Sequence, residues 1–278
     1  MKTAILLFLL VLSFYNLAND KKPKNSLEKQ NLLGKVNIVE DSIFSADEKN
    51  GEFHSGQISY NTSSNYDGNG NILEENSYKT DGSLYSKDTY KYDDKGNQIE
   101  KNRFEEDGLG YRYIYIYDDN GVFIEWKSLN KDSSIIYKHI YSLDENGNII
   151  KEKVYGVDGV IMTEYSIMYD DKGNLIEENE LYSDGSLAGK TILKYDDKGN
   201  VIELSSFDSE GNSDGRSTYI FDEKRDKIEE ESFDTEGNSD GKSIFTYEYD
   251  KSGNWIKKIE FVNDIPANIT KRSITYYK

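Results

Sequence analysis

The segment Tyr90–Glu100 reads YKYDDKGNQIE, and Leu193–Glu203 repeats it as LKYDDKGNVIE. Copies of this motif recur every 25 to 28 residues along most of the chain. If the aromatic or leucine residue before the aspartate is position zero, eight units begin at Tyr66, Tyr92, Tyr117, Leu143, Tyr169, Tyr195, Phe221 and Tyr249. Position +4 is glycine in seven units and Arg225 in the other. A period this regular predicts an array of similar structural units.

Each unit contains two turn signals separated by short runs rich in Tyr, Ile, Thr and Phe. The first is the Asp-x-x-Gly motif, and the second is Asp-Gly or Glu-Gly, as at Asp81-Gly82 and Glu210-Gly211. The runs are short, β-prone and bounded by turn residues, which favours strands over helices. The sequence therefore predicts an all-β fold: an antiparallel β-hairpin repeat array of about eight 26-residue units with two strands each. We expect a meander of about sixteen strands, as an elongated twisted sheet or open solenoid.

The alternation within each unit leaves one question open. Position +7 is Leu73 or an isoleucine, whereas position +12 is aromatic or leucine, and the two have opposite strand parity. Either a β-bulge separates them or both faces of the sheet are partly covered.

The ends of the chain differ from the repeats. Residues 1–18 (MKTAILLFLLVLSFYNLA) have one lysine, an apolar run and a terminal alanine, which is typical of a cleaved secretory signal peptide. Residues 19–61 read as a polar leader and a degenerate capping hairpin with a longer loop around Asp47–Gly51. Residues 62–262 hold the repeats, and residues 263–278 read as a capping edge strand. We therefore expect a secreted, periplasmic or cell-surface protein.

The composition limits the classes of partner. The 278 residues include no cysteine, 34 basic and 52 acidic side chains, for a net charge of −18. Such a surface repels phosphate backbones and anionic headgroups, so we expect neither nucleic-acid binding nor stable membrane insertion. Without disulfides, stability has to come from burial, turns and ions.

The unit containing TYKYDDKGN, followed by IE and a second turn, resembles the YD repeats of RHS-type bacterial surface and secreted proteins. The resemblance covers residues 62–262. It implies a hairpin-array architecture, and YD repeats have been associated with carbohydrate binding. The sequence is too short to close an RHS shell, and we expect neither the core that ends such a shell nor a C-terminal toxin domain.

The function expected from these features is non-enzymatic binding of a glycan or protein by an acidic, tyrosine-rich surface. Flat aromatic faces stack on sugar rings without needing charge. The densest aromatic block is Tyr113, Tyr115, Tyr117, Tyr137 and Tyr141. The same tyrosines could instead form the core of a thin sheet. A structural spacer of the bacterial envelope is the first alternative, and a polysaccharide hydrolase is the second.

The repeated acids raise the question of calcium. Two extended second turns, FDSEGNSDG and FDTEGNSDG, place oxygen ligands on alternate positions. The candidate ligands are Asp208, Glu210, Asn212, Asp214, Asp234, Glu236, Asn238 and Asp240. Neither segment has the glutamate that ends an EF-hand loop, so structural turns are the favoured interpretation and calcium the alternative.

No catalytic motif is recognisable. The two histidines, His54 and His139, have no serine or cysteine motif beside them, and nucleotide-binding and zinc-protease motifs are absent from the sequence. The carboxylates recur with the repeat, as turn and solvent-facing residues do. No catalytic residue is assigned.

Overall fold

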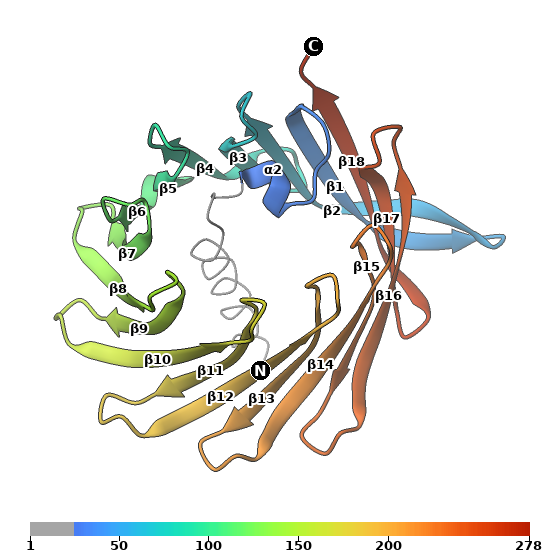
Figure 1. Ribbon diagram of the computed structural model, residues 1–278. Coiled ribbons are helices and arrows are strands. Elements are labelled where there is room, and N and C mark those ends of the chain that lie inside the picture. Colours follow the sequence, from blue (N-terminus) through green and yellow to red (C-terminus); the bar gives the residue numbers. More distant parts are fainter. Residues whose placement is uncertain (1–24) are drawn as a thin grey trace.

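Eighteen antiparallel strands form one sheet that closes into a ring (Figure 1). The computed structural model describes residues 25–278, so the expected signal peptide lies outside the described residues. Each strand pairs with the next along the chain, and β18 pairs with β1. The strands are β1 (Val36–Lys49), β2 (Glu52–Tyr66), β3 (Ile72–Tyr78), β4 (Leu84–Tyr92), β5 (Gln98–Glu105), β6 (Gly108–Tyr117), β7 (Phe123–Asn130), β8 (Ile135–Leu143), β9 (Ile149–Tyr155), β10 (Ile161–Tyr169), β11 (Leu175–Leu181), β12 (Leu187–Tyr195), β13 (Val201–Asp208), β14 (Ser213–Phe221), β15 (Lys227–Phe233), β16 (Ser239–Tyr249), β17 (Trp255–Val262) and β18 (Ile265–Tyr276).

The expected open array is wrong, because the ring is a closed barrel. The eight repeat units supply β3–β18, and the N-terminal hairpin supplies β1 and β2. β18, expected to be an edge strand, pairs with β1 from Val36↔Tyr276 to Ser45↔Asn268. Strand twist accumulates around a long meander, and closure satisfies the backbone groups that two free edges would expose.

A β-bulge in every unit answers the parity question. In the β4–β5 ladder, Tyr92 is opposite Gln98 and Lys91 is opposite Glu100, so Ile99 at position +7 is skipped. The same shift skips the +7 residue of all eight units. A second shift follows each second turn, as at Tyr85 between Tyr78↔Leu84 and Ser77↔Ser86. Each bulge reverses which face the following side chains occupy.

The first turns of the units share one hydrogen-bonding pattern. In the turn after β4, Asp93 Oδ1 accepts the backbone N–H groups of Lys95 and Asn97, and Asn97 Nδ2 donates to Asp93 Oδ2. Gly96 has a φ of 87°, in the left-handed region that glycine adopts without strain. Arg225 occupies the same position in its unit and also has a positive φ, of 70°. This agrees with the prediction from the glycines at this position in the other units. Aspartate therefore caps each turn.

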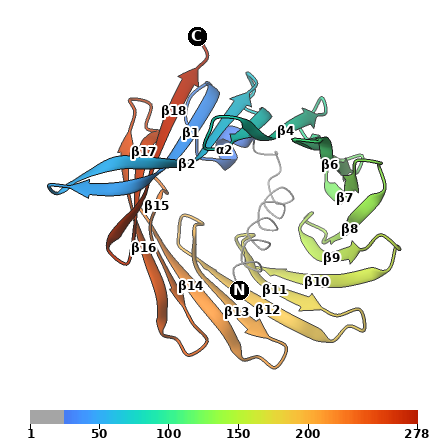
Figure 2. The ribbon, with the colours of Figure 1, turned by 180° about the vertical axis from the view of Figure 1, so that it is seen from behind.

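The two faces of the wall differ in chemistry. Helix α2 (Ser26–Lys29) lies inside the ring (Figures 1 and 2) and belongs to a core with Val36, Val39, Tyr66 and Ile72, so these side chains face inward. A second core has its residues at position +6, which Ile72 also occupies, and at position −2: Tyr115, Phe123, Tyr141, Ile149, Ile167, Leu175 and Leu193. The outer face carries ion pairs that recur with the repeat, among them Glu74–Lys87, Glu100–Lys91, Glu203–Lys194 and Glu229–Lys242.

Helix α2 and the segment after it connect two distant parts of the wall. Asn25 forms a capping box with Glu28, and the Leu27 N–H donates to the Gly70 carbonyl in the turn between β2 and β3. Further along, the Leu33 N–H donates to Asn254 Oδ1 in the turn between β16 and β17. Within residues 25–278, no helix is long and apolar enough to cross a bilayer.

The loop expected around Asp47–Gly51 is shorter than predicted. β1 continues to Lys49 and β2 begins at Glu52, which leaves a two-residue turn of Asn50 and Gly51 with φ values of 55° and 79°. Positive φ at both residues is the geometry of a tight hairpin turn. The resulting long hairpin projects away from the ring (Figures 1 and 2).

Candidate functional site

Grooves open where neighbouring hairpins separate near their second turns. The β4–β5 ladder begins at Lys87↔Phe104, so Leu84–Ser86 at the start of β4 have no partner on β5. The β8–β9 ladder likewise begins at Lys138↔Tyr155. The bulge beside each second turn bends the hairpin tip away from its neighbour. The repeat therefore places a gap between adjacent tips on the outer face.

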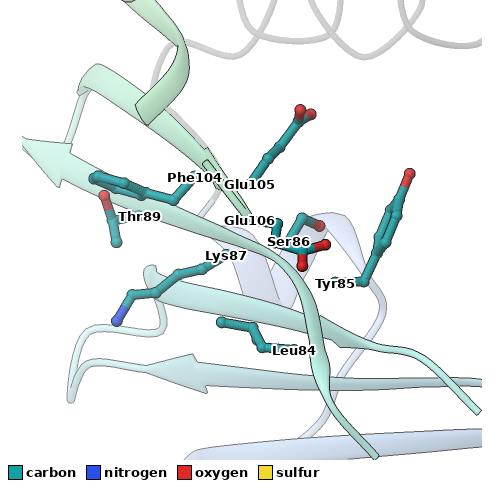
Figure 3. A pocket seen from close by; sticks show the side chains of 8 residues that line it. All are labelled: Leu84, Tyr85, Ser86, Lys87, Thr89, Phe104, Glu105 and Glu106. Carbon is teal, nitrogen blue, oxygen red and sulfur yellow. The ribbon is translucent and has the colours of Figure 1, made fainter. Parts of the chain in front are cut away.

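The larger groove lies between β4 and β5 and has a volume of about 520 Å³. Its lining residues are Leu84, Tyr85, Ser86, Lys87, Thr89, Phe104, Glu105 and Glu106. Figure 3 shows Tyr85 and Phe104 at opposite ends of the group, with Ser86 and Glu106 between them. Leu84 and Tyr85 are 48% and 55% exposed, which is high for apolar side chains and leaves them accessible to a ligand.

The charged side chains of this groove form ion pairs with residues beside it. Lys87 Nζ lies 2.5 Å from Glu74 Oε2, and this hydrogen bond lowers the pKa of Glu74. Glu106 Oε2 lies 3.2 Å from Lys79 Nζ. Glu105 Oε1 lies 3.5 Å from Arg103 Nε. The groove thus combines aromatic faces with hydrogen-bonding groups of both charge signs, of which Glu106 is 85% exposed.

A second groove of about 290 Å³ occupies the equivalent place between β8 and β9. Ile135, Lys138 and Tyr155 line it, at the repeat positions that Leu84, Lys87 and Phe104 occupy in the first groove. The Lys138 amine lies 5.9 Å from the centre of the Tyr155 ring. Two junctions between neighbouring units thus carry a groove lined by residues at the same repeat positions.

The structure brings the tyrosines of the predicted binding block together on the inner face. Tyr115, Tyr117 and Tyr141 have ring centres 5.2 to 6.2 Å from that of Phe123. Tyr113 instead contacts Trp126, at 6.1 Å. Tyr115 and Tyr141 are each only 7% exposed, and burial raises the pKa of both. These side chains build the wall, and a binding role for them stays a prediction.

Tyr137, the fifth tyrosine of that block, is 43% exposed near the start of β8. It lies two residues from Ile135, which lines the second groove. Of the five predicted tyrosines it is the one most accessible to solvent.

An inner-face network joins His139 to the aromatic block. The rings of His139 and Trp126 are stacked with centres 3.9 Å apart. His139 Nδ1 lies 2.6 Å from Glu152 Oε1, and the Tyr141 hydroxyl donates to the same oxygen at 3.2 Å. The Trp126 indole N–H donates to the Tyr141 hydroxyl. The network links three neighbouring strands, β7, β8 and β9, and Glu152 is only 3% exposed.

The predicted calcium ligands form turns like those of the other units. Asp208 Oδ1 accepts the N–H groups of Glu210 and Asn212, and Asn212 Nδ2 donates to Asp208 Oδ2. Asp234, Glu236 and Asn238 repeat this pattern. Asp214 and Asp240 lie one residue inside β14 and β16. Across residues 25–278, no three His, Cys, Asp or Glu side chains are grouped to hold a metal ion. Calcium binding by these turns stays a prediction.

Sequence reasoning missed the groove residues Leu84, Tyr85 and Phe104 as a group. Phe104 was placed at position +12, but its neighbours come from a different strand of another unit. The available signal was the pair of large apolar residues, Leu84 and Tyr85, so soon after the turn residues Asp81 and Gly82. Residues beside a surface turn are normally exposed, so a large apolar pair there is informative.

Comparisons with known proteins add similarity of fold. No family model matches the chain, and no curated protein matches its sequence. A porin-like protein from Bacteroides uniformis ATCC 8492 matches with 10% identity and a TM-score of 0.41, over 86% of this chain and 96% of that one. A porin-like protein from Bacteroides vulgatus ATCC 8482 matches with 10% identity and a TM-score of 0.38, over 87% and 99%. TcdB2-TccC3 matches with 13% identity and a TM-score of 0.40, over 85% of this chain but only 16% of that one.

The strand pairing shows that the protein is a closed β-barrel, and these are solved structures to which it is similar. The YD-repeat resemblance rests on the repeat motif, since no family model supports it.

Proposed function

We propose that the protein is an exported, non-enzymatic binding protein that takes a carbohydrate into the groove between β4 and β5. The observation that carries this proposal is the composition of that groove. Tyr85 and Phe104 offer flat apolar faces, while Thr89 and Glu106 offer hydrogen-bond donors and acceptors. Carbohydrates present the same combination of apolar ring faces and hydroxyl groups. The volume of about 520 Å³ lies within the range of small-ligand sites.

The charge of the protein narrows the class of carbohydrate. The chain has a net charge of −18, and two carboxylates, Glu105 and Glu106, border the groove. An anionic polysaccharide would be repelled, whereas neutral sugars and protonated amino sugars would not. Cello-, malto- and chito-oligosaccharides, and their de-acetylated amino forms, are therefore the first probes.

Isothermal titration with this panel, followed by variants, tests the proposal. Tyr85→Ala should weaken binding about tenfold, because it removes an accessible aromatic face worth about 1.4 kcal/mol. Tyr182→Ala is the matched control, since Tyr182 is also 55% exposed and also lies at a hairpin tip, but lines neither groove. It should leave affinity unchanged.

Two results would count against carbohydrate binding here. One is no measurable affinity for any member of the panel, which would favour the spacer alternative. The other is an equal loss for Tyr85→Ala and Tyr182→Ala, which would place the ligand elsewhere.

A further inference from the structure

The outer half of the β1–β2 hairpin pairs only with itself. The β1–β18 ladder ends at Ser45↔Asn268, and the β2–β3 ladder begins at Asn61↔Tyr78. Beyond these points, within residues 25–278, β1 and β2 have only each other as ladder partners, up to Lys49↔Glu52. The hairpin projects outward from the ring in both views (Figures 1 and 2). In a barrel whose other strands pair on both sides, it leaves two strand edges open.

The two open edges differ in charge. The β1 edge ends in Asp47, Glu48 and Lys49, and charged side chains are a common protection of exposed edges. The β2 side has no Asp, Glu, Lys or Arg from Phe53 to Tyr66. Those 14 residues are uncharged in a chain in which 31% of residues are charged. After Glu52, the β2 edge therefore lacks the charged side chains that protect the β1 edge, and its regular ladder with β1 runs from Glu52 to Ser55, before the bulge at Gly56 and Gln57.

The register shows which backbone groups face the open β2 edge. A two-residue turn makes Lys49 and Glu52 a hydrogen-bonded pair. Hydrogen-bonded and non-hydrogen-bonded pairs then alternate, so Phe53 and Ser55 direct their N–H and C=O groups away from β1. The Phe53 ring meets the Phe261 ring of β17 edge-on, with centres 5.2 Å apart. This contact anchors the hairpin, so the edge is held in place before any partner arrives.

We propose that the β2 edge at Phe53–Ser55 binds an extended, basic peptide segment of a partner protein, which adds as a further strand. Main-chain hydrogen bonds supply affinity in this mode of recognition. A second copy of this chain is a poor occupant, because each copy has a net charge of −18 and each hairpin tip carries three acids and one base. This surface is separate from the proposed carbohydrate groove, so the two proposals stand or fall independently.

The test uses two blocked eight-residue peptides of alternating valine and threonine, one with three lysines and one with three glutamates at the same positions. The lysine peptide should bind the full-length protein, and the glutamate peptide should bind at least tenfold more weakly. On binding, amide hydrogen exchange at Phe53 and Ser55 should slow. The His54 amide, which already faces β1, should not change.

A matched pair of proline variants locates the site. Ala46 and Ser55 lie opposite each other in the hairpin, and each directs its N–H outward, on different edges. Ser55→Pro removes an outward donor from the β2 edge and should weaken binding about tenfold, as the loss of one hydrogen bond predicts. Ala46→Pro imposes the same backbone restraint on the β1 edge and should not.

Equal effects of the two prolines would overturn the proposal. Unchanged exchange at Phe53 and Ser55 in the unmodified protein with peptide bound would overturn it too. The exchange measurement needs no substitution, so it decides the matter even where a proline variant unfolds the hairpin. If the protein dimerises and the amides of Phe53 and Ser55 are protected in the dimer, the partner at this edge is a second copy of the chain. That result would also refute the proposal.

Discussion

The ion pair between Arg272 and Asp41 should hold the barrel closed. Arg272 Nε lies 2.7 Å from Asp41 Oδ1, and Nη2 lies 2.6 Å from Oδ2, across the seam between β18 and β1. The guanidinium carbon also lies 3.5 Å from the centre of the Trp255 ring. The two charged side chains are 12% and 22% exposed. In a bidentate ion pair with so little exposure to solvent, each charged side chain is stabilised by its partner.

Arg272→Met should lower the free energy of unfolding by about 3 kcal/mol. Removing one partner of a buried pair costs about 3–5 kcal/mol, and the residual exposure of Asp41 favours the lower end. Replacing both charges, in Asp41→Leu with Arg272→Met, should restore most of that loss, because no unpaired carboxylate is then left in the wall. Urea unfolding followed by circular dichroism measures all three free energies.

Arg216→Met is the matched control. Arg216 also pairs with a carboxylate, Glu203 at 3.6 Å, and also lies over an aromatic ring, Phe233 at 4.2 Å. It is on the outer face, and its side chain is 41% exposed, so its loss should cost less than about 1 kcal/mol. A loss below 1 kcal/mol for Arg272→Met, or a double variant as unstable as the single one, would refute the seam argument.

Three further predictions concern the turns, helix α2 and pH. Asn200→Ala removes the acceptor of the Arg225 Nε hydrogen bond, and in that background Arg225→Gly should raise the free energy of unfolding by about 1 kcal/mol in thermal melts. An unchanged or lower melting temperature would contradict backbone strain at the Arg225 φ of 70°. Leu27→Ala should lower the free energy of unfolding in urea by about 3 kcal/mol, because Leu27 is 7% exposed. Leu33→Ala, at a 52% exposed position, should lower it by less than about 0.5 kcal/mol. Similar losses of stability in the two variants would argue against the packing of α2 on the wall. The hydrogen bond from the backbone N–H of Asn148 is the main cause that lowers the pKa of Asp144 below 3.8. Ionised Asp144 therefore stabilises the fold above that pH, and this stabilisation is lost as the pH falls through the lower pKa of the folded state. At pH values below about 4 the urea concentration at the unfolding midpoint should decrease, and it should decrease less in Asp144→Asn.

Most of the strands and turns could be predicted from interactions between residues close together in the sequence. The aspartate and glycine of each first turn determine its geometry without help from distant residues, which is why Arg225 could be expected at positive φ from its position alone. The candidate site was harder to predict. Tyr85 and Phe104 belong to different units, and their shared groove exists because two hairpin tips diverge. The tyrosine block between Tyr113 and Tyr141 was found as a cluster, but sequence could not show that two of its five tyrosines, Tyr115 and Tyr141, are buried.

The sequence by itself determined the repeat unit, its two turns and the antiparallel meander, because these depend on contacts between residues close along the chain. Tertiary structure alone decided that the meander closes. Closure brings Val36–Ser45 against Asn268–Tyr276, more than 200 residues away, and no periodic pattern records which strand the last one meets. It also decided which face is inside, since the bulge at position +7 reverses the alternation on which sequence reasoning depends.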